Sequence, residues 1–183
     1  MKALYKFSFS IFVMIYLSSC VSQSGNDMKS IKEMETKLAA TRQDVKLAAQ
    51  LDAAYHTYIR KYPEDTILPH MLFEDAQISI YPLNKMDAAI DQLTIIYTKY
   101  PNSRYAPNAL FKSAYLNEKT QRFDKAKSLY LLFVQTYPNN ELASQAKILA
   151  SMTGLTEDEQ LKQVLEKRNL IQDSIRNQKK VQK

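Results

Sequence analysis

The chain contains little glycine, cysteine and histidine, and it contains no tryptophan. Two glycines in 183 residues argue against an all-β fold, because the tight turns of such folds depend on glycine. A single cysteine excludes a disulfide framework, and no group of His and Cys residues has the spacing of metal ligands. The sequence also lacks a glycine-rich phosphate loop, a GxSxG motif and an HExxH motif. We therefore expect no catalytic residues, no cofactor and no metal site.

The remaining composition is that of a globular protein. Apolar residues make up 45% of the chain and charged residues 24%, which suits one folded domain with extensions. The formal net charge of +6 is a mild excess spread along the chain, so it requires no nucleic-acid partner. Neighbouring carboxylates such as Glu74-Asp75 and Glu157-Asp158 are expected to lie on solvated helix faces.

The first twenty residues have the pattern of a targeting signal. A basic segment (1–6) precedes an uncharged run (7–17), which is too short for a membrane span of about 20 residues. The run fits the hydrophobic region of a signal peptide. The next residues complete Leu17-Ser18-Ser19-Cys20, which resembles the lipobox of bacterial lipoproteins. This resemblance implies cleavage before Cys20 and lipidation of its thiol. The alternative is an ordinary signal followed by a chance cysteine, although Cys20 has no disulfide partner.

The resemblance to lipoproteins also implies a location. In enteric bacteria an aspartate after the lipidated cysteine retains the protein in the inner membrane, and here Val21 occupies that position. No acidic run of the kind that directs some Bacteroidetes lipoproteins to the cell surface follows Cys20. We expect an outer-membrane protein that faces the periplasm. The expected segments are a signal peptide (1–19), a lipidated cysteine with a flexible tether (20–29), a repeat domain (30–152), and a C-terminal helix with a basic disordered tail (153–183).

An internal repeat organises the middle of the chain. Tyr-Pro recurs at Tyr62-Pro63, Tyr100-Pro101 and Tyr137-Pro138, and segments 86–103 and 123–140 align. Apolar residues spaced by three or four positions predict an amphipathic helix before each proline, and the proline ends it. A second helical pattern follows each Tyr-Pro pair, and such hairpins must stack on their neighbours to bury their apolar faces. The predicted elements are a leading helix (43–61), two hairpins (66–100 and 104–137) and a closing helix (141–152).

The aligned segments resemble the tetratricopeptide repeat. Segment 106–140 is similar to the repeat of the Tol-Pal-associated periplasmic protein. More loosely, it resembles the tetratricopeptide lipoprotein of the β-barrel assembly machinery, and it is closer to small Bacteroidetes lipoproteins of this architecture. The resemblance implies an all-α fold, a short right-handed solenoid of tetratricopeptide-like helical hairpins with a C-terminal capping helix.

The C-terminal extension begins with helix signals. Gly154 suits the position after a helix end, and Thr156 with Glu159 forms a capping-box pattern. A thin apolar stripe follows, made of Leu161, Val164, Leu165, Ile171 and Ile175. This helix either caps the end of the solenoid or docks a partner. We expect the last seven residues to be disordered.

The resemblance implies function by binding, with no enzyme activity. The proposed role is a membrane-anchored periplasmic scaffold or adaptor that binds segments of envelope proteins, in cell-envelope assembly or maintenance. The alternative is a structural or cell-wall-associated spacer without a specific peptide ligand. In this family the first helix of each hairpin lines the binding groove, and Phe73 and Phe111 could equally be core residues. By carry-over, the partner-binding residues are His70, Phe73, Gln77, Asn108, Phe111, Tyr115, Glu118 and Gln145. The oligomeric state stays open.

Overall fold

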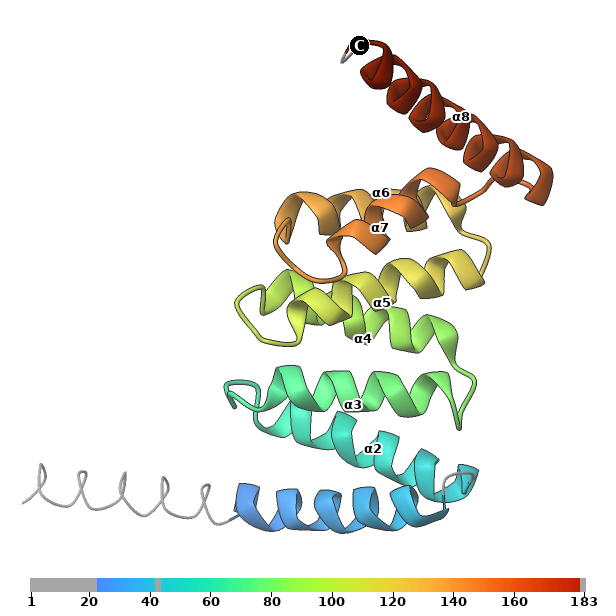
Figure 1. Ribbon diagram of the computed structural model, residues 1–183. Helices are drawn as coiled ribbons and strands as arrows, with labels where there is room; N and C mark the ends of the chain where they lie inside the picture. Colours follow the sequence, from blue (N-terminus) through green and yellow to red (C-terminus); the bar gives the residue numbers. More distant parts are fainter. Residues whose placement is uncertain (1–22, 42–43, 182–183) are drawn as a thin grey trace, which may run out of the picture. The chain divides into compact units, whose positions relative to one another are not determined.

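The computed structural model describes residues 23–41 and 44–181, and all regular structure in these residues is helical. The predicted signal peptide and Cys20 lie outside the described residues. After a helix over 23–41, the elements are α2 (Val45–Lys61), α3 (Leu68–Ile80), α4 (Met86–Lys99), α5 (Ala106–Lys119), α6 (Phe123–Thr136), α7 (Ala143–Met152) and α8 (Glu157–Val181) (Figure 1). The chain divides into two compact units between Ala109 and Leu110. The all-α helical repeat predicted from the sequence is confirmed.

The three Tyr-Pro pairs of the repeat end helices at equivalent places. Tyr62, Tyr100 and Tyr137 follow α2, α4 and α6, with φ of −130°, −125° and −126° and ψ of 63°, 53° and 56°. A residue before proline avoids the helical region, because the proline ring collides with its backbone. Each tyrosine N–H still donates to the carbonyl four residues earlier, so one geometry closes all three helices.

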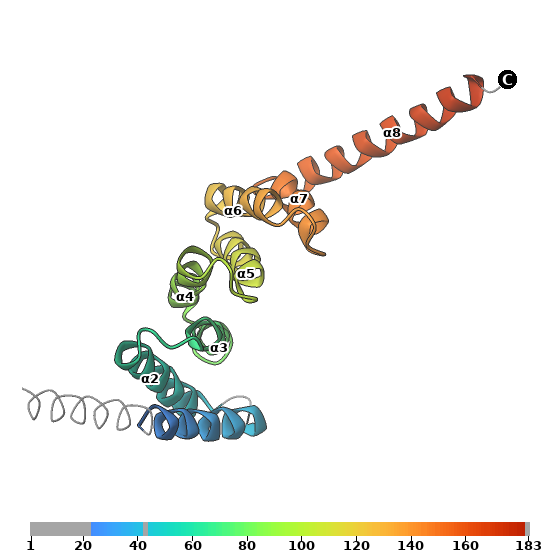
Figure 2. The same cartoon turned by 90° about the vertical axis from the view of Figure 1, so that its left-hand side faces the viewer.

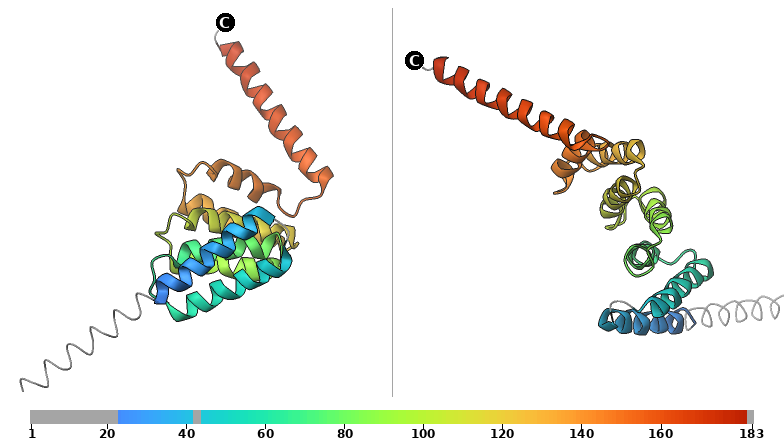
Figure 3. Two further views of the ribbon diagram at one scale, coloured as in Figure 1. Left: turned by 90° about the horizontal axis from the view of Figure 1, so that it is seen from below. Right: turned by 90° about the vertical axis from the view of Figure 1, so that its right-hand side faces the viewer.

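In the first unit, the described residues begin with a helix that includes part of the predicted tether. Residues 23–41 pack beside α2 (Figures 1 and 3), and Ile31 and Leu38 are buried in the core of this unit. The Tyr55 hydroxyl of α2 also donates to the Glu35 carboxylate at 2.6 Å. The prediction of a flexible tether is therefore wrong for the described residues 23–29, and α2 is the second helix of a hairpin.

The physical reason is an apolar stripe that continues upstream of the predicted domain. Met28, Ile31 and Leu38 are spaced by three and seven residues, so they share one face of a helix. The polar composition of residues 22–26 favoured a flexible tether, so this helical pattern was not predicted. Asp27 further joins this helix to α2, because its carboxylate pairs with the Lys61 amine at 2.7 Å.

The two later hairpins contain the same turn. Asn84, between α3 and α4, and Gln121, between α5 and α6, have positive φ of 53° and 61°. They are 37 residues apart, which is the period of the repeat. Figure 2 shows α3 followed by α4 and, in the second unit, α6 followed by α7. Ala76 and Ala89 in the first unit, and Ala126 in the second, are completely buried, as expected for close helix packing.

The C-terminal helix forms as predicted but is not covered. Gly154 has a positive φ of 85° after α7, and the Thr156 and Glu159 side chains each bind the other's backbone N–H. α8 then extends away from α6 and α7 (Figures 2 and 3). Its apolar stripe is exposed, so the helix does not cap the repeat with this face. It also continues to Val181, through most of the segment predicted to be disordered.

Among the described helices, none combines the length and the apolar character that a membrane span requires.

Candidate partner-binding surface

Three of the predicted binding residues lie on one face of α3. His70, Phe73 and Gln77 are half-buried, and their spacing of three and four residues places them in a row along the helix. The Gln77 amide reaches the carbonyl of Phe73 at 3.5 Å. The predicted alignment of these side chains is therefore observed, and none of them is deeply buried.

Tyr105, in the turn before α5, completes an aromatic cluster on this face. Its ring centroid lies 5.4 Å from those of both His70 and Phe73, and its hydroxyl is 2.9 Å from Nδ1 of His70. The Arg104 guanidinium lies 4.8 Å from the Tyr105 ring centroid and donates to the tyrosine hydroxyl at 2.6 Å. These four residues, the α3 aromatic cluster, present rings and a cation together on the first unit. Tyr105 and Arg104 were not among the predicted binding residues, because they lie in a turn outside the helical pattern.

Asn108, near the start of α5, is exposed on the first unit. The remaining predicted residues belong to the second unit. Tyr115 is exposed, with the Lys119 amine 5.3 Å from its ring centroid. Gln145 on α7 is also exposed. The structure therefore leaves Asn108, Tyr115 and Gln145 accessible to a partner.

Phe111 and Glu118 instead take part in packing within the second unit. The Phe111 ring contacts Tyr130 and Phe133 edge to face, with centroids 5.6 Å and 5.5 Å apart. The Glu118 carboxylate accepts a hydrogen bond from the Tyr130 hydroxyl at 3.0 Å and one from Thr153 at 3.4 Å. Burial, together with this carboxylate, raises the pKa of Tyr130. Replacing Glu118 would leave a buried hydroxyl without its acceptor, so Glu118 has a structural role here.

A second group of polar residues joins α2, α3 and α4. These residues were not predicted to form a site. Asp75 is completely buried, and its Oδ2 lies 3.0 Å from Nε2 of His56 and accepts a hydrogen bond from the Gln92 amide. Asp52 pairs with the Lys85 amine at 3.0 Å. We call these five residues the polar cluster. The expectation that Glu74-Asp75 lies on a solvated face is wrong for Asp75, because α2 and α4 cover it.

The electrostatics of the polar cluster follow from burial. Loss of hydration is the main cause that raises the pKa of Asp75 to about 8. The nearby charge of Asp52 also raises this pKa, whereas the charge of Lys85 lowers it. Ligand atoms of Asp52, His56 and Asp75 lie within 4.8 Å of one another, so these three residues could hold a cation. Lys85 already neutralises Asp52. The arrangement therefore works as an internal network that joins three helices.

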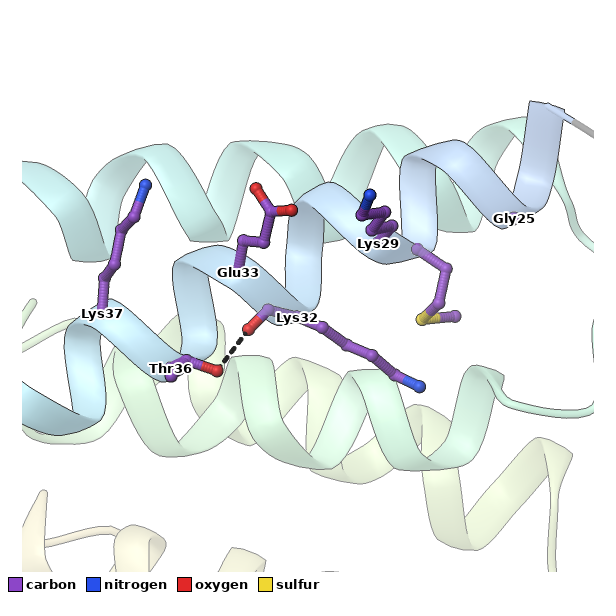
Figure 4. Close-up of a pocket in the computed structure, with 7 residues that line it drawn as sticks. Gly25, Lys29, Lys32, Glu33, Thr36 and Lys37 are labelled. Atoms are coloured by element: carbon purple, nitrogen blue, oxygen red, sulfur yellow. Dashed lines mark hydrogen bonds between the residues drawn. The ribbon is translucent and has the colours of Figure 1, made fainter.

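The helix over residues 23–41 also carries a shallow depression of about 630 Å³ (Figure 4). Among the described residues, its lining consists of Gly25, Met28, Lys29, Lys32, Glu33, Thr36 and Lys37 of this helix. Thr36 donates to the backbone carbonyl of Lys32 at 2.8 Å, and the lysine side chains extend outward in Figure 4. Because the charged groups point apart rather than converge, the depression has none of the geometry of a catalytic or ligand site.

Comparison with known proteins agrees with the helical architecture. No curated protein and no solved structure gave a significant match to the chain. Residues 108–140, which include most of α5 and all of α6, match the family of the tetratricopeptide repeat. Repeats of this family are typically non-catalytic modules of protein–protein interaction. The match and the stacked hairpins together support a tetratricopeptide-repeat protein.

Proposed function

We propose that this protein is an exported, lipid-anchored scaffold that binds a segment of another envelope protein along the first helices of its hairpins. In this proposal Cys20 carries the lipid, and the repeat domain faces the periplasm from the outer membrane. The process served is assembly or maintenance of the cell envelope. The lipobox-like sequence before Cys20 and the tetratricopeptide match at 108–140 support it.

The observation that carries the proposal is the α3 aromatic cluster. Tyrosine and arginine are enriched among the residues that dominate binding energy at protein interfaces. Here Arg104 and Tyr105 contact each other, and Tyr105 is supported by His70 and Phe73, so the rings are held in place before a partner arrives. A preorganised site costs less conformational entropy on binding. The cluster suits a segment with an aromatic or acidic side chain, since it offers both ring faces and a cation.

Site-specific photo-crosslinking in intact cells tests this surface. A photoreactive phenylalanine analogue replaces Asn108 or Tyr115, which are exposed on α5, the first helix of its hairpin. In the control, the analogue replaces the exposed Lys127 on α6, the second helix of the same hairpin. We expect a discrete protein adduct from positions 108 and 115 and none from position 127. A spacer without a specific ligand would give no adduct, or the same adducts at all three positions, and either result would overturn the proposal.

A further inference from the structure

The apolar stripe of α8 is an exposed apolar feature that the repeat does not explain. Leu161, Val164, Ile171 and Ile175 are exposed by 58%, 46%, 60% and 48%. Their spacing of three, seven and four residues matches the two apolar positions of a heptad. The same register places Arg168 in the middle of the stripe. A helix with such a seam gains stability when a second helix covers it.

The charges of α8 are separated along its length. Residues 157–166 carry four carboxylates and one lysine, whereas residues 167–181 carry five cations and one carboxylate. An antiparallel second copy would bring the acidic half of each helix beside the basic half of the other. It would also oppose the two helix dipoles favourably. A parallel copy would place like charges together. The charge distribution is thus complementary to itself in one orientation only.

We propose that α8 pairs with α8 of a second copy of this chain as an antiparallel two-helix coiled coil. A full overlap sets Val164 beside Ile175 of the partner subunit and Arg168 beside Ile171 of the partner subunit. It also brings Asp158 near Lys179 of the partner subunit. In a parallel pair, Arg168 would instead face its own copy in the seam, where two buried like charges repel.

The charge pattern also distinguishes this partner from a lipid surface. Helices that lie on membranes carry lysine and arginine along their polar face, which anionic lipids attract. The acidic residues Glu157, Asp158 and Glu159 at the start of α8, together with Glu166, would be repelled by such a surface. A polar residue in the seam lowers the stability of a coiled coil while selecting its register. We therefore expect a reversible dimer.

Sedimentation of the full chain tests the pairing. The chain carries Cys20→Ser, which removes its only thiol and the predicted anchor, and it is studied in mild detergent over a concentration series. We expect a mass that rises toward twice the monomer mass with concentration. Ile171→Asp should abolish this rise. Leu170→Asp is the matched control, because Leu170 is the adjacent residue and 70% exposed but lies off the stripe. Circular dichroism verifies that both variants stay helical.

Disulfide trapping tests the orientation. In the same thiol-free background, one chain carries Gln160→Cys and a second, larger tagged chain carries Gln178→Cys. An antiparallel pair places position 160 near position 178 of the partner, so oxidation of the mixture should give the mixed disulfide. A parallel pair would give disulfides between identical chains. A monomer at every concentration, equal loss of pairing in Leu170→Asp, or disulfides between identical chains would overturn the proposal.

Discussion

The carboxyl group of Asp75 lies in an environment that disfavours its ionised form. It is buried between α2, α3 and α4, and its partners are the imidazole of His56 and the amide of Gln92. Its Oδ1 has no hydrogen-bond partner among the described residues. Burial therefore disfavours the ionised form, and the nearby charge of Asp52 adds to this effect. The protonated form is preferred in the folded protein well above the pH at which an unfolded aspartate ionises.

This raised pKa predicts a specific dependence of stability on pH. Between the unfolded pKa of 3.8 and the folded pKa of about 8, the folded state binds the proton of Asp75 and the unfolded state does not. The free energy of unfolding should therefore fall as pH rises through this window, by up to about 1.4 kcal/mol per pH unit. Asp75→Asn removes the titrating group, so its free energy of unfolding should fall less between pH 5 and pH 8.

Urea denaturation of wild type and Asp75→Asn across this pH range measures the effect. Asp91→Asn, an exposed change on α4, is the control and should follow the wild type. If the difference between wild type and Asp75→Asn were the same at every pH, the carboxyl of Asp75 would not titrate as the structure indicates.

At the scale of the helix, close packing depends on small residues at repeated positions. Ala126 of α6 is completely buried, and the next residue, Lys127, is exposed on the same helix. Leucine at position 126 would force neighbouring side chains from their preferred rotamers, which typically costs about 1–3 kcal/mol. Lys127→Leu introduces the same side chain at a surface position and should change stability by about 0.5 kcal/mol or less. Thermal and urea unfolding compare the two variants, and equal effects would show that the two hairpins are wrongly aligned.

At the scale of the whole molecule, the proposed function depends on a lipid anchor at Cys20. If Cys20 is the lipidated residue, Cys20→Ser should abolish labelling by a palmitate analogue and move the protein from the membrane fraction to the soluble fraction. The reason is that two or more acyl chains hold a protein firmly at about 0.8 kcal/mol per buried CH₂, whereas the unmodified chain has no such contact. A serine variant that remains labelled and membrane-bound would show that the anchor lies elsewhere.

Features that depend on neighbouring residues could be predicted from the amino-acid order alone. Tyr62, Tyr100 and Tyr137 each end a helix because the following proline acts on the residue directly before it, and Thr156 caps α8 through a glutamate three residues later. The buried alanines were predictable as well, since a repeat places equivalent residues in equivalent contacts. The period of 37 to 38 residues therefore predicted the helical hairpins. The first-helix binding positions came from the resemblance to the tetratricopeptide repeat, and they stay a prediction.

Contacts between side chains that are distant in the sequence depend on how the helices pack, so they could not be predicted. Asp52, Asp75 and Gln92 come from three helices, and nothing in their local sequence distinguishes them from solvated residues. Burial by neighbouring helices makes them one network. Glu118 was likewise predicted to bind a partner, whereas in the structure its carboxylate accepts a hydrogen bond from Tyr130, twelve residues later. Local sequence selects helices through short-range sterics and hydrogen bonds, whereas the role of a polar side chain depends on what folding places beside it.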